Sequence, residues 1–154
     1  MHTGKSKQKN SEKVMKVFKT ILYWVVSCTW GALMTCAGAA VAVVLIALGY
    51  KPKRFHYNIY FEVGVRWGGL SLGAFFFVSW CASDSIKRHE AGHGIQNLIF
   101  GALFPVLIGV PSAVRYWYRR IVVALKPERR RSLPDYDAVW FERQATRLGE
   151  KYFV

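Results

Sequence analysis

The residues of this chain best suited to chemistry are two histidines and a glutamate in the stretch KRHEAGHGIQNLIFGALF, which begins at Lys87. His89 and His93 are four positions apart, so both imidazoles would lie on one face of an α-helix and could bind the same ion. Glu90 follows His89 directly, where a general base is needed beside an open coordination position of zinc. The spacing predicts one zinc ion bound by His89 and His93, with Glu90 as the base. The alternative is a set of polar residues at the interfacial end of a helix.

An α-helix must carry this motif, and the flanking sequence supports one. Asp84 or Ser85 can act as its N-cap, because short polar side chains accept hydrogen bonds from the first free backbone amides. No proline interrupts the stretch SIKRHEAGHGIQNLI, so the helix is expected to continue through both histidines.

Long apolar runs indicate a membrane protein. No charged residue occurs from Thr20 to Tyr50, and about 20 apolar residues are enough to span a bilayer. We therefore predict a transmembrane helix over residues 21–49, and favour an uncleaved anchor over a signal peptide, whose apolar core is only about 7–15 residues long. A second apolar run predicts a second transmembrane helix over residues 66–83. The simplest arrangement is a helical hairpin joined by the loop KPKRFHYNIYFE.

The net charge of +13 does not require a nucleic-acid partner. Lys and Arg number 6 in residues 1–20, 4 in residues 50–66 and 12 in residues 84–154. If both termini are cytoplasmic, most basic residues lie inside, as the positive-inside rule expects. We predict a multi-pass integral membrane protein of the inner (cytoplasmic) membrane, with both termini cytoplasmic. Its expected partners include membrane lipids and no nucleic acid, and the oligomeric state is unknown.

A zinc site built on two histidines needs a third protein ligand. The candidates outside the motif are His2, His56, Cys81 and the other acidic residues. The predicted topology places His56 across the membrane and His2 in the basic tail, so the C-terminal segment is the better source.

The C-terminal stretch LPDYDAVWFERQATRLGEKYF predicts an amphipathic helix after Pro134, capped by Asp135 or Asp137. Glu142 lies on this helix within a stripe of small residues that would let another helix approach closely; the stripe contains Ala138, Ala145 and Gly149. The alternative is an ordinary surface glutamate beside Arg143.

For Glu142 to reach the histidines, the uncharged segment 94–114 must turn back. A single crossing would leave Glu142 on the wrong side and place the later basic residues against the positive-inside rule. Pro105, Gly109 and Pro111 can break a helix here. We therefore predict a re-entrant or interfacial apolar hairpin over residues 94–114, covered by other parts of the protein.

The motifs together resemble the membrane gluzincins of the CAAX-prenyl-endopeptidase and heat-shock-protease type, which combine His-Glu-x-Gly-His with a downstream Glu-x-x-Ala-Asp. They also resemble a group of short bacterial membrane proteins with the patterns HExGHxxQ, GxPS and WxExxA. This chain has HEAGHGIQ from His89, GVPS from Gly109 and WFERQA from Trp140. The similarity covers residues 84–153.

The resemblance implies a zinc metallopeptidase in which His89, His93 and Glu142 bind the ion and Glu90 is the base. Thr146 stands where those peptidases have an acidic residue that supports the site, so this chain departs from the family pattern at that position. A residue that stabilises the oxyanion is also expected, and the sequence does not rank its candidates: Arg115, Tyr116, Tyr118 and Tyr136.

The sequence therefore predicts an all-α integral membrane protein. It comprises a basic cytoplasmic tail (1–19), a transmembrane helical hairpin (20–83) and a metallopeptidase core (84–154) with the HExxH helix, the re-entrant segment and the C-terminal helix. The predicted function is zinc-dependent endopeptidase activity on membrane proteins or peptides near the cytoplasmic membrane face. The alternative is a non-catalytic integral membrane protein, such as a metal-binding scaffold, a subunit or a small pore or lysis protein.

Overall fold

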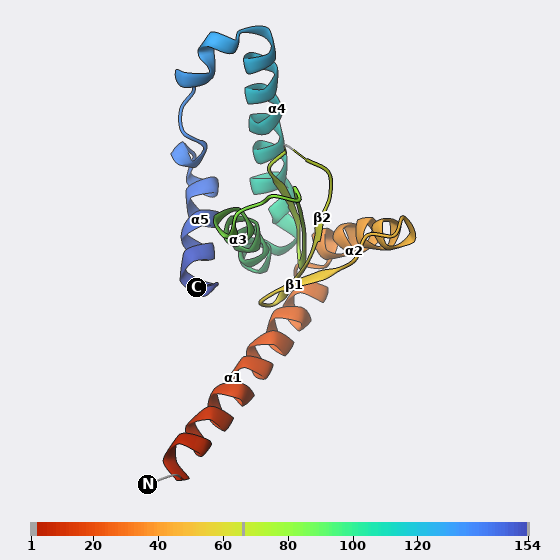
Figure 1. Ribbon diagram of the computed structural model, residues 1–154, viewed down its shortest axis with the longest axis vertical. Helices are drawn as coiled ribbons and strands as arrows, with labels where there is room; N and C mark the ends of the chain where they lie inside the picture. Colours follow the sequence, from red (N-terminus) through yellow and green to blue (C-terminus); the bar gives the residue numbers. More distant parts are fainter. Residues whose placement is uncertain (1–2, 66, 154) are drawn as a thin grey trace.

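The computed structural model describes residues 3–65 and 67–153, with the side chains of residues 3–7 and of Tyr136 outside the description. It consists mostly of α-helices, with one small mixed sheet (Figure 1). The helices are α1 (Thr3–Cys28), α2 (Ala32–Ala47), α3 (Asp84–Phe100), α4 (Val110–Leu125) and α5 (Trp140–Tyr152). The strands are β1 (Lys53–Phe55), β2 (Asn58–Glu62), β3 (Gly69–Leu72) and β4 (Phe75–Val78). The expectation of an all-α protein is therefore wrong for the segment that contains these strands.

The predicted transmembrane helix over residues 66–83 is instead a β-hairpin. Leu72 pairs with Phe75, so Gly73 and Ala74 form a two-residue turn between β3 and β4. Gly73 has φ of +64°, a left-handed conformation that glycine adopts without steric cost and that such hairpin turns require. The aromatic run of β4 is also suited to a strand, and all four of its residues are buried.

The sheet has the strand order β1-β2-β4-β3, so β3 lies at one edge. The hairpins β1–β2 and β3–β4 are antiparallel, whereas β2 and β4 run parallel. The sheet contacts α2 and α3 (Figure 1). Phe61 and Phe76 are fully buried within it, and Phe76 packs in one cluster with Ala91 of α3. The predicted loop KPKRFHYNIYFE thus supplies two strands of this sheet.

The single transmembrane helix predicted over residues 21–49 is broken into α1 and α2, which are bent by 97°. Asn97 of α3 contacts the chain at this break, where its Nδ2 donates a hydrogen bond to the Gly31 carbonyl at 3.1 Å. A Cβ atom at Gly31 would lie 2.3 Å from that Nδ2 atom, so only glycine permits the contact. Thr29 also returns a hydrogen bond to the Val25 carbonyl, a pattern that bends helices.

The chain reversal predicted for residues 94–114 is present. α3 leads into a 3₁₀ turn (Gly101–Leu103) and a π-helix (Pro105–Gly109), and the helical stretches Asp84–Leu103 and Pro105–Leu125 are bent by 119° relative to each other. Within residues 3–65 and 67–153, no single helix is both long and apolar enough to cross a bilayer. The α1–α2 and α3–α4 pairs reach that length and composition only when each bent pair is taken as a whole.

The ends of two helices differ by a few residues from the expectation. α3 is capped by Ser83, whose Oγ accepts a hydrogen bond from the Ile86 amide, and not by Asp84 or Ser85. α5 begins at Trp140, after a 3₁₀ turn (Tyr136–Ala138), and has no side-chain cap. The N-cap position is Val139, so neither Asp135 nor Asp137 caps α5, and the Asp137 carboxylate accepts a hydrogen bond from Thr146 instead.

Candidate metal centre

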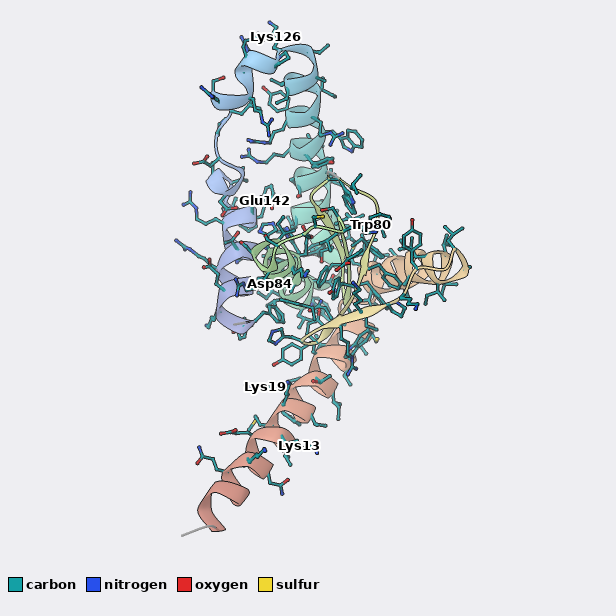
Figure 2. All side chains as sticks on the ribbon, in the orientation of Figure 1. Lys13, Lys19, Trp80, Asp84, Lys126 and Glu142 are labelled. Carbon is teal, nitrogen blue, oxygen red and sulfur yellow. The ribbon has the colours of Figure 1, made fainter. Side chains whose placement is uncertain are left out.

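The backbones of α3 and α5 lie in direct contact, which brings the metal motif next to Glu142 (Figure 2). A Cβ atom at Gly92 would lie 2.0 Å from the Ala145 carbonyl oxygen, and one at Gly149 would lie 2.2 Å from the Arg88 carbonyl oxygen. Real side chains never approach so closely, so both positions require glycine. Of the small residues noted around Glu142, Ala145 and Gly149 therefore lie on the face that α5 presents to α3, whereas Ala138 is exposed in the 3₁₀ turn before α5.

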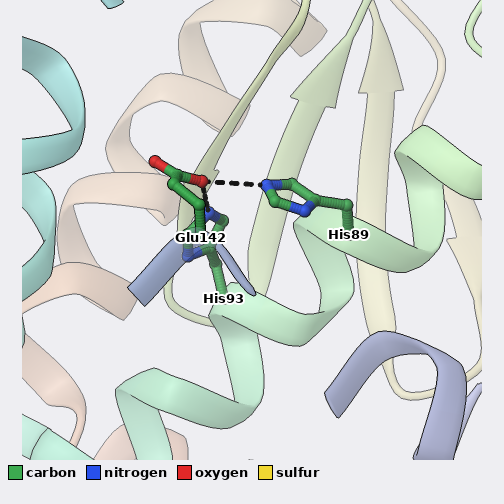
Figure 3. A group of neighbouring side chains, drawn as sticks. All are labelled: His89, His93 and Glu142. Carbon is green, nitrogen blue, oxygen red and sulfur yellow. Dashed lines mark hydrogen bonds and ion pairs between the residues drawn. The ribbon is translucent and has the colours of Figure 1, made fainter. Parts of the chain in front are cut away.

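His89, His93 and Glu142 meet at one point (Figure 3). Glu142 Oε2 is 3.1 Å from His89 Nε2 and 3.3 Å from His93 Nε2, and the possible ligand atoms of the three residues all lie within 4.8 Å of one another. Two ligand atoms on a tetrahedral zinc ion lie roughly 3.3 Å apart, given bonds of about 2.0–2.1 Å. The spacing of these three side chains therefore fits a zinc ion.

The tautomer of His93 follows from its contact with Gln96. Gln96 Nε2 donates hydrogen bonds to the Phe141 carbonyl (2.8 Å) and to Gln144 Oε1 (2.9 Å). Its Oε1 is therefore the atom that contacts His93 Nδ1, at 2.7 Å. An amide oxygen only accepts, so Nδ1 carries the hydrogen. The other ring nitrogen, Nε2, points at Glu142; it donates to the carboxylate when it carries a proton, and presents a lone pair to a cation when it does not.

His89 is held in the same tautomer by a hydroxyl. Thr146 Oγ1 donates a hydrogen bond to Asp137 Oδ2 at 3.1 Å, and lies 2.9 Å from His89 Nδ1. Because its hydrogen is directed at the Asp137 carboxylate, the hydroxyl accepts from Nδ1–H of His89. Asp137 thus supports His89 through Thr146. Thr146 is the residue that stands where the resembling peptidases have an acidic one, and here the acidic group comes from Asp137 instead.

Glu142 is fully buried and ionised. Its burial opposes the charge, but hydrogen bonds from His89, His93 and Ser112 outweigh that cost and hold the pKa of its carboxyl well below the ordinary value. Ser112 Oγ donates to Oε1 at 2.5 Å, which leaves Oε2 directed at the two histidines. The Nε2 atoms of both imidazoles and one carboxylate oxygen therefore converge, and a cation can replace the Nε2 protons that hydrogen-bond to Glu142.

Glu90 is also buried, with 6% of its surface exposed, and lies between two recesses of about 330 Å³ each. Both recesses are bordered by Gly69, Glu90 and Tyr116. The first recess also contacts Ile86, His89 and Thr146, and the second contacts His93 and a set of apolar residues that includes Trp67, Leu70, Phe104, Ile108 and Trp117. Burial raises the pKa of the Glu90 carboxyl, although His93 and His89 partly oppose this change. An acid–base group with a raised pKa is suited to accept and return a proton.

The other ligand candidates lie elsewhere. His56 packs against the ring of Phe153, with centroids 5.4 Å apart, and Cys81 is exposed. His2 lies outside the described residues. Within the part of the chain that the structure describes, His89, His93 and Glu142 form the group of three that could hold a metal ion.

The structure also distinguishes the candidates for stabilising an oxyanion. Tyr116 borders both recesses, whereas 59% of Tyr118 is exposed. Arg115 donates a hydrogen bond to the Asp135 carbonyl, and the side chain of Tyr136 lies outside the described residues. Tyr116 is therefore the candidate next to Glu90.

Three residues that position the ligands had no assigned role in the sequence analysis: Gln96, Ser112 and Asp137. Gln96 and Ser112 do occur in the patterns HExGHxxQ and GxPS, which was the available signal. Asp137 was considered only as a helix cap, because nothing in the sequence connects it with Thr146.

Comparison with known proteins gives no relative. A scan against protein-family models, a search of curated proteins and a search of solved structures each found no match. A function for this chain must therefore be argued from the geometry of the site.

The purified protein is expected to bind one zinc ion, and His89→Ala and Glu142→Ala are each expected to lose it, because each removes one of the converging ligand atoms. Elemental analysis after dialysis measures the zinc content. His56→Ala is the control and should retain the metal, since His56 packs against Phe153. A wild-type protein without zinc would contradict the site.

Thr146→Val is expected to weaken zinc binding by about 10–100-fold, because it removes the acceptor for His89 Nδ1–H. Thr146→Ser keeps the hydroxyl and should bind nearly as the wild type does. Competition with a zinc chelator gives the dissociation constants. Equal affinity in Thr146→Val would exclude a supporting role for the hydroxyl.

Proposed function

We propose that this chain is a zinc-dependent membrane endopeptidase that hydrolyses peptide bonds near the cytoplasmic face of the membrane. The observation that carries the proposal is the convergence of His89 Nε2, His93 Nε2 and Glu142 Oε2 beside the buried Glu90 and its two recesses. The resemblance of HEAGH and ExxA to the membrane gluzincins supports the same chemistry.

His89, His93 and Glu142 would hold the zinc ion, which would supply Lewis acidity to a peptide carbonyl and to a water molecule. Glu90 takes a proton from the attacking water and transfers it to the nitrogen of the leaving amine. The burial of Glu90 limits competing contact with bulk water, and the raised pKa of its carboxyl favours return of the proton. Tyr116 donates a hydrogen bond to the carbonyl oxygen as negative charge develops on it.

A peptide substrate is supported by the position of β3. β3 pairs with β4 on one side only and forms an edge of the sheet, and Gly69, Leu70 and Ser71 border the second recess. An extended peptide can add to such an edge through backbone hydrogen bonds. Its apolar side chain would enter the second recess beside Trp67 and Phe104. This arrangement favours apolar segments, such as those of membrane proteins.

Membrane attachment is proposed through the two bent helix pairs, in place of the hairpin of two transmembrane helices. α2 and the α3–α4 reversal expose large apolar side chains, among them Val43, Val106 and Val110, with 60–69% of each exposed. Exposed apolar surface of this extent is typical of contact with a membrane or a partner. If each bent pair of helices enters the membrane and leaves it again on the cytoplasmic side, both basic termini stay in the cytoplasm.

Glu90→Gln is expected to keep zinc but to lose on the order of a hundredfold or more in proteolysis, because an amide cannot take the proton from water. The assay is cleavage of fluorescein-labelled β-casein by the detergent-solubilised, zinc-loaded protein. Wild-type activity should disappear with a chelator and return with zinc. If Glu90→Gln cleaves as fast as the wild type, Glu90 is not the base. A zinc-loaded wild type that cleaves nothing would favour the metal-binding scaffold.

Tyr116→Phe is expected to lower kcat by about a hundredfold with little change in KM, because its hydroxyl acts on the charge of the transition state. The matched control is Tyr118→Phe, which changes an exposed tyrosine of the same helix and should leave both constants unchanged. The same β-casein assay over a range of concentrations gives the two constants. An equal loss in both variants would exclude a specific role for Tyr116.

A further inference from the structure

A groove runs between α1 and α3, away from the metal centre. It has a volume of about 500 Å³, and is bordered by Leu22 and Val26 of α1 and by Ile95 and Leu98 of α3. Its other border includes Lys19 of α1 and Lys151 of α5. Lys19 lies on the part of α1 that leads to the body of the protein (Figure 2).

The groove changes from charged to apolar along its length. On α1 its lining passes from Lys19 through Leu22 to Val26, a distance of about 10 Å at 1.5 Å per residue. On α3 it passes from Ile95 to Leu98, toward the point where Asn97 binds Gly31 at the α1–α2 break. The cationic end therefore lies toward the N-terminal half of α1, and the apolar end toward the predicted membrane segment.

Another recess, which is not one of the two beside Glu90, continues the groove at its cationic end and has a volume of about 490 Å³. The recess and the groove share Lys19, Tyr57 and Tyr152 as border residues. This recess adds Lys16 and His56, and contains one acidic residue, Glu12. Three lysines against one glutamate leave a net charge of +2 with histidine neutral. Among the described residues, no ion pair neutralises Lys16, Lys19 or Lys151.

We propose that this groove binds an anionic phospholipid of the cytoplasmic leaflet. The phosphate would lie between Lys19 and Lys151, and one acyl chain would follow Leu22, Val26 and Leu98. A free phosphate ion would use the cations but not the apolar floor, and a neutral apolar helix would use the floor but not the cations. A lipid with a charged head and an apolar chain matches both ends of the groove.

The site would fix the depth of the protein in the bilayer. Lys19 is the last basic residue before the uncharged run from Thr20 to Tyr50, so a bound phosphate marks the level of the head groups. Lys151 lies on α5, the helix that also carries Glu142, so the same lipid would hold α5 near the membrane surface. The inference does not depend on the proposed peptidase activity.

Native mass spectrometry of the delipidated full chain in detergent tests the proposal, with dioleoylphosphatidylglycerol and dioleoylphosphatidylcholine as probes. The wild type should bind one phosphatidylglycerol molecule with clear preference over phosphatidylcholine. The double variant Lys19→Gln/Lys151→Gln should bind phosphatidylglycerol more weakly by about tenfold or more, because it removes two cations from the phosphate site. Both lysines lie at the surface, so the protein should still fold and bind zinc.

The matched control is Lys9→Gln/Lys13→Gln, which removes two charges from α1 outside the groove and should bind phosphatidylglycerol as the wild type does. Equal losses in both double variants, or equal binding of the two lipids, would overturn the proposal. Complete displacement of the lipid by millimolar inorganic phosphate would also overturn it, since it would indicate an anion site without a place for the acyl chain. The measurement reports binding and not hydrolysis, so an inactive protein does not affect it.

Discussion

The contact between the backbones of α3 and α5 is the constraint on which the metal centre depends. Gly92 faces the Ala145 carbonyl and Gly149 faces the Arg88 carbonyl, with no space for a Cβ atom at either glycine. Glycine inside a helix costs about 1 kcal/mol in helix propensity, so its presence at both contact points needs a compensating gain in packing. That gain is the approach of two helices that places Glu142 within 3.1–3.3 Å of both histidines. A larger side chain at either position would separate the ligands.

The second determinant of the centre is the protonation pattern imposed from outside it. Gln96, Thr146 and Ser112 come from three different helices, and each contacts the outer polar atom of one ligand. Buried polar atoms without partners are costly, so these contacts help offset the burial of two imidazoles and a carboxylate. Because the outer atoms are occupied, Nε2 of each histidine and Oε2 of Glu142 point inward. The site is therefore organised by its hydrogen bonds, which direct its three ligand side chains at one another.

The apolar sequence around the centre serves two structural purposes. Residues of the predicted second transmembrane helix form β3 and β4, which supply Gly69 to the recesses beside Glu90 and a sheet edge for the proposed substrate. The apolar residues of α1 and α2 remain largely exposed. At the break between these two helices, the Gly31 carbonyl accepts a hydrogen bond from Asn97 of α3, the helix that carries His89 and His93. The proposed membrane segments and the candidate centre therefore share one rigid helix. This coupling is compatible with an enzyme that acts on substrates at the membrane surface.

The sequence by itself determined the features that depend on spacing along one segment. It placed His89 and His93 on one helical face, put Glu142 in a stripe of small residues, and required the chain to turn back within residues 94–114. It did not determine whether the glycine- and aromatic-rich run 66–83 is a helix or a hairpin, because an apolar run without clear periodicity fits both. It also gave no sign that the first apolar run would break at Gly31, where Asn97 contacts it, or that Asp137 would support His89 through Thr146. Those outcomes depend on contacts between residues far apart in the chain, which only the packing of α3 against α1, α5 and the sheet brings together.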